Sequence, residues 1–121
     1  KGSIISVMAT DIPLSSRQIG RVIRRASVGL ARLGSFIGHG SGEVMLGFTT
    51  ANRVPHAPEK GVMDFRAVSE NRIDSLFRAM AEAEEEAVLN SMVTARTVTG
   101  YDGTVKRSLN EFMDAILAWR E

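Results

Sequence analysis

Two serines in this sequence stand among residues that favour nucleophilic chemistry. The first is Ser3, which follows Gly2 near the start of the chain. A serine at a true N-terminus carries a hydroxyl nucleophile and an α-amine whose pKa of about 7.7–8.0 lets it act as a base near neutrality. In a precursor, the preceding glycine leaves the backbone free to adopt a strained geometry in which the hydroxyl attacks the Gly2 carbonyl and splits the chain. The alternative is that Gly2-Ser3 is an arbitrary chain boundary.

The second serine is Ser41, which lies between two glycines and two positions before Glu43. Residues two apart on an extended backbone point to the same side, so the Ser41 hydroxyl and the Glu43 carboxylate are expected on one side of a strand. Such a pair could form a hydrogen-bonded relay. The alternative is a glycine-rich turn with a solvated glutamate.

The nucleophile-elbow and P-loop signatures are both excluded around Ser41. The elbow requires glycine two residues on either side of the serine, where this sequence has His39 and Glu43. The P-loop requires lysine and then serine or threonine after its second glycine, and neither follows Gly42. The absence of cysteine excludes thiol catalysis and disulfides. The two histidines, His39 and His56, do not form a pair at metal-ligand spacing, so we expect no metal site and no cofactor.

Alternating strands and helices are predicted to position these residues, which indicates an α/β fold. The predicted strands are rich in β-branched residues, and the predicted helices repeat apolar residues at three- and four-residue steps. We expect strands over 3–9 and 43–50, helices from Ser15 or Ser16 to Leu33, over 69–93 and through 109–117, and a turn at 100–103. Two strands make a poor sheet, and strands this apolar need cover on both faces. We therefore expect further strands from another segment or another chain.

Charge is unevenly distributed along the chain, although the net charge is +1. Residues 1–35 hold six basic residues against one acidic residue, mostly on the predicted helix, and an acidic stretch covers 82–86. We interpret both runs as solvated helix faces, with contact to phosphate or to an acidic partner as the alternative for the arginines. Because the charges nearly balance and no apolar run reaches about 20 residues, we expect neither nucleic acid nor membrane as a partner.

Several segments together resemble one known family of enzymes. They occur in order along the chain: Ser-Ile-Ile-Ser-Val-Met-Ala-Thr-Asp-Ile-Pro-Leu at 3–14, Gly-Leu-Ala-Arg-Leu-Gly-Ser at 29–35, Gly-Ser-Gly-Glu at 40–43, Phe-Thr-Thr-Ala-Asn at 48–52, Glu-Glu-Ala-Val-Leu-Asn-Ser at 85–91 and Thr-Gly-Tyr-Asp-Gly at 99–103. The sequence thereby resembles the self-processing L-aminopeptidase/D-amidase-esterase family, which includes the β-peptidyl aminopeptidases. The resemblance extends to about residue 105.

This resemblance implies a particular fold and a second subunit. Enzymes of the family are made as one precursor, which cuts itself into a larger N-terminal and a smaller C-terminal subunit. Both stay in one αββα sandwich, similar to N-terminal nucleophile hydrolases but with a different strand connectivity and related to ornithine acetyltransferase. Residues 1–121 would then be a single C-terminal subunit, or a fragment of a larger domain, that supplies part of the sheets and helices. The expected partners are the larger subunit and further copies of the two-subunit protomer.

The resemblance also implies roles for individual residues. Ser3 matches the nucleophile and Gly2-Ser3 the cleavage site, Ser41 matches the serine near the nucleophile, and Glu43 matches the carboxylate that orients that serine. The implied reaction is hydrolysis of N-terminal aminoacyl amides, esters or short peptides through an acyl-enzyme on Ser3. Because Lys1 and Gly2 precede Ser3, this base mechanism requires cleavage first.

Two other functions remain as alternatives. Acyl transfer of the ornithine acetyltransferase kind uses a threonine nucleophile in place of a serine, and a non-catalytic homologue or binding module would keep only the fold. The cellular location stays open between the cytoplasm and the periplasm, because an upstream segment could carry a signal peptide.

Overall fold

The computed structural model describes residues 2–57 and 61–119. They form two compact units, Lys1–Glu85 and Glu86–Glu121. The first unit contains β1 (Ile4–Thr10), α1 (Ser16–Ile23), α2 (Ala26–Arg32), β2 (Glu43–Thr49), the 3-10 helix η1 (Glu70–Arg72) and the start of α3 (Ile73–Thr94). The second unit contains the end of α3, β3 (Val98–Thr99), β4 (Val105–Lys106), η2 (Leu109–Phe112) and α4 (Met113–Ala118).

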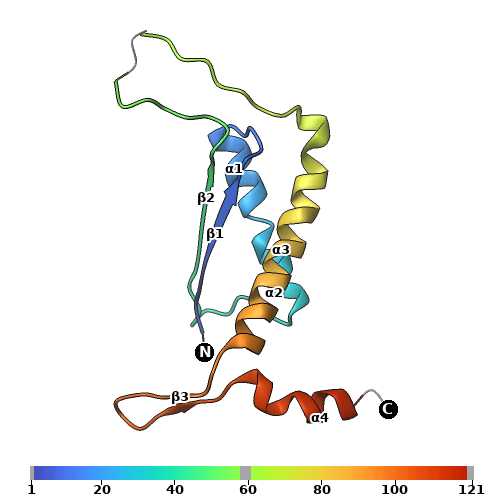
Figure 1. The fold of residues 1–121 in the computed structure, drawn as a ribbon. Helices are drawn as coiled ribbons and strands as arrows, with labels where there is room; N and C mark the ends of the chain where they lie inside the picture. Colours follow the sequence, from blue (N-terminus) through green and yellow to red (C-terminus); the bar gives the residue numbers. More distant parts are fainter. Residues whose placement is uncertain (1, 58–60, 120–121) are drawn as a thin grey trace. The chain divides into compact units, whose positions relative to one another are not determined.

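The two long strands form a parallel pair, in which Ile4 lies opposite Glu43 and Thr10 lies opposite Thr49. Parallel neighbours need a crossover connection, and here α1 and α2 provide it. Figure 1 shows α1, α2 and the first part of α3 on one side of this strand pair. The two strands predicted from the sequence are therefore confirmed to within one residue at each end.

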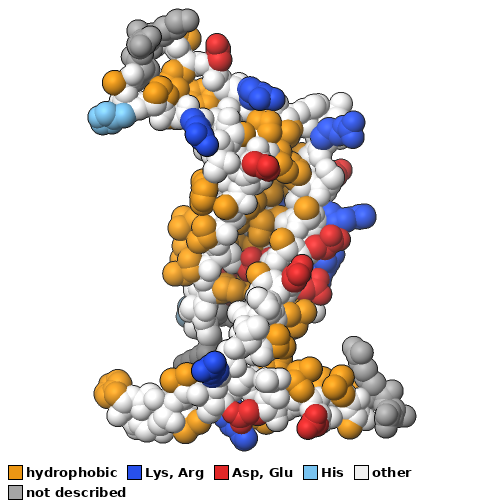
Figure 2. All heavy atoms as spheres, in the orientation of Figure 1, with side chains coloured by type: hydrophobic (Ala, Val, Ile, Leu, Met, Phe, Trp, Pro, Cys, Tyr) orange, Lys and Arg blue, Asp and Glu red, His pale blue; other side chains and the backbone are white. Residues whose placement is uncertain are grey.

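The outer side of the strand pair is apolar and exposed. Along β1 the side chains alternate, so that Ser6 is buried under the helices while Ile5 and Val7 are 70% and 62% exposed. On β2, Val44, Leu46 and Phe48 are about half exposed. Figure 2 shows hydrophobic side chains along the strand side of this unit. The sequence predicts that both faces of the strand pair are covered. In the part of the chain that the structure describes, the helices cover one face and the other is exposed.

The predicted helix from Ser15 to Leu33 is two helices, and Arg25 explains the break. Ser15 caps α1 together with Gln18 in a capping box, as expected for its start. At the other end, the Arg25 guanidinium donates to the Arg21 carbonyl at 3.0 Å, while the Arg25 N–H turns to the Val22 carbonyl at 2.9 Å. The tighter turn ends α1, and α2 begins at Ala26.

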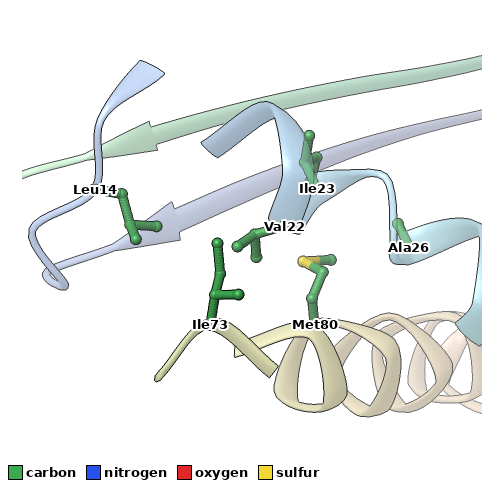
Figure 3. Packing of buried hydrophobic residues seen from close by; sticks show 6 residues of the cluster. All are labelled: Leu14, Val22, Ile23, Ala26, Ile73 and Met80. Carbon is green, nitrogen blue, oxygen red and sulfur yellow. The ribbon is translucent and has the colours of Figure 1, made fainter. Parts of the chain in front are cut away.

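Apolar side chains of α1, α2, α3 and the segment before α1 form the core of the first unit. Figure 3 shows six of them: Leu14, Val22, Ile23, Ala26, Ile73 and Met80. Gly29 of α2 lies so close to α3 that a Cβ there would be 2.5 Å from the Ala81 carbonyl oxygen and 2.8 Å from Glu84 Cβ. The absence of a side chain at Gly29 thus allows α2 to pack against the backbone of α3.

Gly29→Ala is expected to destabilise the protein by about 1–3 kcal/mol, because the neighbouring atoms are backbone and must move. Gly20→Ala is the matched control. Gly20 lies in α1, and a Cβ there would have no atom within 4 Å. Because alanine has the better helix propensity, this variant should be more stable than the wild type by roughly 0.5–1 kcal/mol. Urea unfolding of the full-length protein measures both. Equal shifts in the two variants would show that the close approach at Gly29 does not constrain the packing.

The arginines of α1 and α2 contact groups of this chain. Arg17 and Arg21 form ion pairs with Glu70, which also accepts from the buried Gln18 amide at 3.0 Å. The Gln18 amide, together with the two guanidinium groups, holds the pKa of Glu70 below its ordinary value. Arg25 stacks on the Phe77 ring at 3.8 Å from its centre. These contacts link α1 to the start of α3, while Arg17 and Arg24 stay exposed to solvent. The predicted solvated face is therefore present, and it also carries ion pairs within the chain.

Glu84 corrects the interpretation of the acidic stretch. The acidic stretch 82–86 is predicted as a solvated face, yet Glu84 is 5% exposed and accepts a hydrogen bond from the Ser6 hydroxyl at 2.6 Å. Glu84 lies four residues after Met80 and eleven after Ile73, on the stripe of α3 that faces the core. Position on the helix therefore decides its burial, despite the surrounding charges.

The second unit is built around a short antiparallel hairpin. β3 and β4 flank the predicted turn at 100–103, where Gly103 has φ of +79°. The backbone N–H and hydroxyl of Thr104 both donate to the Asp102 carboxylate, at 3.0 and 2.8 Å, and these hydrogen bonds lower the pKa of Asp102. The turn is confirmed, while the two-residue strands beside it are not predicted from the sequence.

Candidate active site

Ser3 lies beside the start of β1, where the two strands first pair. Its Oγ accepts a hydrogen bond from the Gly42 N–H at 3.2 Å, and the Ile4 N–H donates to the Gly42 carbonyl at 3.1 Å. Gly42 therefore bonds to both Ser3 and Ile4. The parallel register of β1 and β2, with Ile4 opposite Glu43, brings Ser3 to the Ser41–Glu43 segment.

Ser41 and Glu43 form the hydrogen bond predicted from their spacing. The Ser41 hydroxyl donates to Glu43 Oε1 at 2.5 Å, and both residues are partly buried. This distance lies at the short end of the range for O–H···O hydrogen bonds, so the Ser41 hydroxyl is held toward Glu43. The pair is linked to Ser3 by one residue, because Gly42 stands between Ser41 and Glu43 and donates to Ser3 Oγ.

An open cleft of about 520 Å³ brings the three predicted residues together. Its walls come from the start of β1, the end of α2, the loop between α2 and β2, and the start of β2. The lining residues are Gly2, Ser3, Ile4, Leu30, Gly34, Ser35, Phe36, Ile37, Gly38, His39, Gly40, Ser41 and Glu43. A substrate in this cleft would have access to the Ser3 hydroxyl, the Ser41–Glu43 pair and several apolar groups.

The loop between α2 and β2 contributes an unusual backbone conformation and a histidine to the cleft. Ile37 has φ of +52°, a region that β-branched residues rarely adopt. His39 is an exposed residue of this loop and lines the cleft, whereas His56 lies on the exposed loop after β2. The unusual run Gly38-His39-Gly40 was the available signal for a special backbone here.

Two further kinds of feature are absent from the part of the chain that the structure describes. Within residues 2–57 and 61–119, no three His, Cys, Asp or Glu side chains lie close enough together to hold a metal ion. In the same part of the chain, no helix combines the length and the apolar character needed to cross a membrane.

Comparison with known proteins identifies the family of this chain. A family model described as peptidase family S58 matches residues 1–106. The chain belongs to peptidase family S58. Among curated S58 relatives, a β-peptidyl aminopeptidase, BapA of Sphingosinicella microcystinivorans, is 37% identical over 117 residues, which cover 96% of this chain and 30% of that protein.

Two solved structures extend the likeness to three dimensions. The PH0078 protein of Pyrococcus horikoshii OT3 is 41% identical with a TM-score of 0.82, over 95% of this chain and 33% of that one. The L-aminopeptidase D-Ala-esterase/amidase of Ochrobactrum anthropi is 33% identical with a TM-score of 0.81, over 94% and 32%. That enzyme is described as a serine aminopeptidase with a variant of the Ntn hydrolase fold.

These likenesses confirm the α/β fold class of the N-terminal nucleophile hydrolase kind and the resemblance to the aminopeptidase family. The chain spans about a third of the length of these three proteins. The roles of Ser3, Ser41 and Glu43 remain predictions, as does the division into subunits.

Proposed function

We propose that this chain is the nucleophile-bearing, C-terminal part of a self-processing serine aminopeptidase. The observation that carries the proposal is that Ser3 and the hydrogen-bonded Ser41–Glu43 pair line one cleft, with Ser3 Oγ bound to the N–H of the intervening Gly42. Family membership supports aminopeptidase chemistry, because two of the similar proteins, BapA and the Ochrobactrum anthropi enzyme, are named as aminopeptidases.

Self-cleavage would use the peptide bond before Ser3. The Ser3 hydroxyl attacks the Gly2 carbonyl carbon, the C–N bond breaks, and the amine of Ser3 takes up a proton as it leaves. The resulting ester between Gly2 and the Ser3 oxygen is then hydrolysed by water. Gly2 lines the same cleft as Ser41 and Glu43, so the bond to be cut lies beside the polar groups that would assist it.

Turnover would then use the free N-terminal residue. The α-amine of Ser3 accepts the hydroxyl proton near neutral pH, and the hydroxyl oxygen attacks the carbonyl of an aminoacyl amide, ester or short peptide. The leaving amine or alcohol takes the proton, and water releases the acyl group from Ser3. The Ser41 hydroxyl, oriented by Glu43, would hold the amine and hydroxyl of Ser3 in place.

The larger subunit is proposed to cover the outer face of the strand pair. Ile5, Val7 and Leu46 lie on this face and are each more than half exposed, although apolar residues of a strand gain free energy when they are buried. A second sheet stacked on this face would complete the predicted sandwich. The same subunit would supply part of the oxyanion-stabilising donors.

An assay of the full-length, processed protein tests this function against its alternatives. We expect release of nitroaniline from an aminoacyl nitroanilide and no acetyl transfer from acetylornithine. Intact-mass analysis should find two polypeptides, the smaller of which begins at Ser3. Acetyl transfer without hydrolysis would favour the acyltransferase, and a processed protein inactive on both substrates would favour the non-catalytic homologue.

A further inference from the structure

A buried polar contact joins β1 to α3 three residues after Ser3. The Ser6 hydroxyl donates to Glu84 Oε1 at 2.6 Å, and the two residues are 7% and 5% exposed. The pair lies 78 positions apart in the chain, so it links elements that are distant in sequence. Burying a carboxylate with so few partners costs free energy, and apolar residues of similar size are often at least as stable. A contribution to stability therefore does not explain why this position holds a polar pair.

The sequence of β1 explains what the pair can do. From Ile4 to Ala9 every residue except Ser6 is apolar, so both faces of the strand suit an apolar environment. A shift by one residue would exchange the two faces while burying similar apolar groups. It would also move Ser3 by about 3.3 Å along the strand, away from the Gly42 N–H. Ser6 is the residue of this run that distinguishes the two registers, because its hydroxyl reaches Glu84 in one of them.

The elements around the cleft also meet at Glu84. Gly29 of α2 packs directly on the turn of α3 that carries Glu84, and Arg32 of α2 forms an ion pair with Glu85 at 3.1 Å. α2 leads into the cleft through Leu30, while β1 carries Ser3 and Ile4. Two walls of the cleft are thus held against the same turn of α3.

We propose that the Ser6–Glu84 pair positions the candidate nucleophile by fixing the register of β1. In this register Ser3 Oγ lies on the Gly42 N–H, next to the Ser41–Glu43 pair. Ser6 and Glu84 are positioning residues, since they act through the strand and not on the substrate. This proposal rests on the proposed function of Ser3.

Single substitutions in the full-length precursor test the contact. In Glu84→Ala and Ser6→Ala we expect self-cleavage and kcat on an aminoacyl nitroanilide to fall by about tenfold to a hundredfold, with KM nearly unchanged. Glu84→Gln should stay within about threefold of the wild type, because its amide oxygen can still accept from Ser6. Glu82→Gln, in the same acidic stretch but exposed, should equal the wild type.

The double variant Ser6→Ala/Glu84→Leu separates positioning from stability. Its apolar pair should restore the unfolding midpoint to that of the wild type or above, while kcat stays about tenfold low because the register is no longer specified. Wild-type kcat in a folded double variant, or in Ser6→Ala, would overturn the proposal. A Ser3→Ala precursor measured alongside distinguishes the two failures: if it is active, Ser3 is not the nucleophile, and if it is inactive, only the positioning role has failed.

Discussion

Ser3→Ala in the full-length precursor is expected to give a single uncleaved polypeptide without aminopeptidase activity. Alanine lacks the oxygen that forms both the ester with Gly2 and the acyl-enzyme. Removing the nucleophile of a comparable serine hydrolase costs on the order of 10⁶-fold in kcat, so both activities should fall below detection. A denaturing gel measures cleavage, and an aminoacyl nitroanilide measures turnover.

The control for this experiment is Ser16→Ala, which removes an exposed hydroxyl at the first position of α1, outside the cleft. It should be cleaved and active like the wild type. The appearance of two bands for Ser3→Ala would remove Ser3 from the cleavage step. If the Ser3→Ala protein is cleaved in this way and then hydrolyses the nitroanilide, Ser3 is not the nucleophile of turnover either.

The strands and the Ser41–Glu43 contact follow from local patterns. The side-chain period of an extended chain places residues two apart on one side, so the sequence suffices to predict that Ser41 faces Glu43. The contact between Ser3 and Gly42 could not be predicted in this way, since it depends on the parallel register of two strands about 40 residues apart. The resemblance to a known family identified Ser3 as a candidate, and the fold shows how it reaches the other two residues.

The failures of the sequence interpretation have a common cause. Local periodicity predicts one helix through Arg25. Instead, the Arg25 side chain donates a hydrogen bond to the Arg21 carbonyl, the Arg25 N–H donates to Val22, and α1 ends. Charge composition predicts a solvated Glu84, but the helical stripe it shares with Met80 places it in the core. In both cases one side chain makes a specific tertiary or backbone contact, and residue-type averages do not predict such contacts.

Ser41→Ala and Glu43→Gln are expected to lower kcat by about a hundredfold or more while the protein stays folded. The 2.5 Å hydrogen bond fixes the direction of the Ser41 hydroxyl, and in the proposed mechanism its lone pairs would serve the amine and hydroxyl of Ser3. Ser41→Ala removes this group, whereas Glu43→Gln keeps an acceptor but removes the charge, so its loss should be smaller. Steady-state kinetics on the processed enzyme measures both effects.

The double variant and a surface control make this second prediction decisive. If Ser41 and Glu43 act as one unit, the double variant should lose little more than Ser41→Ala alone, because Glu43 acts through Ser41. Glu111→Gln removes the same charge from an exposed ion pair with Arg107 and should leave kcat unchanged. Losses that multiply in the double variant would mean that the two residues act separately. Near-wild-type kcat in Ser41→Ala would mean that the Ser41–Glu43 hydrogen bond only shapes the turn before β2.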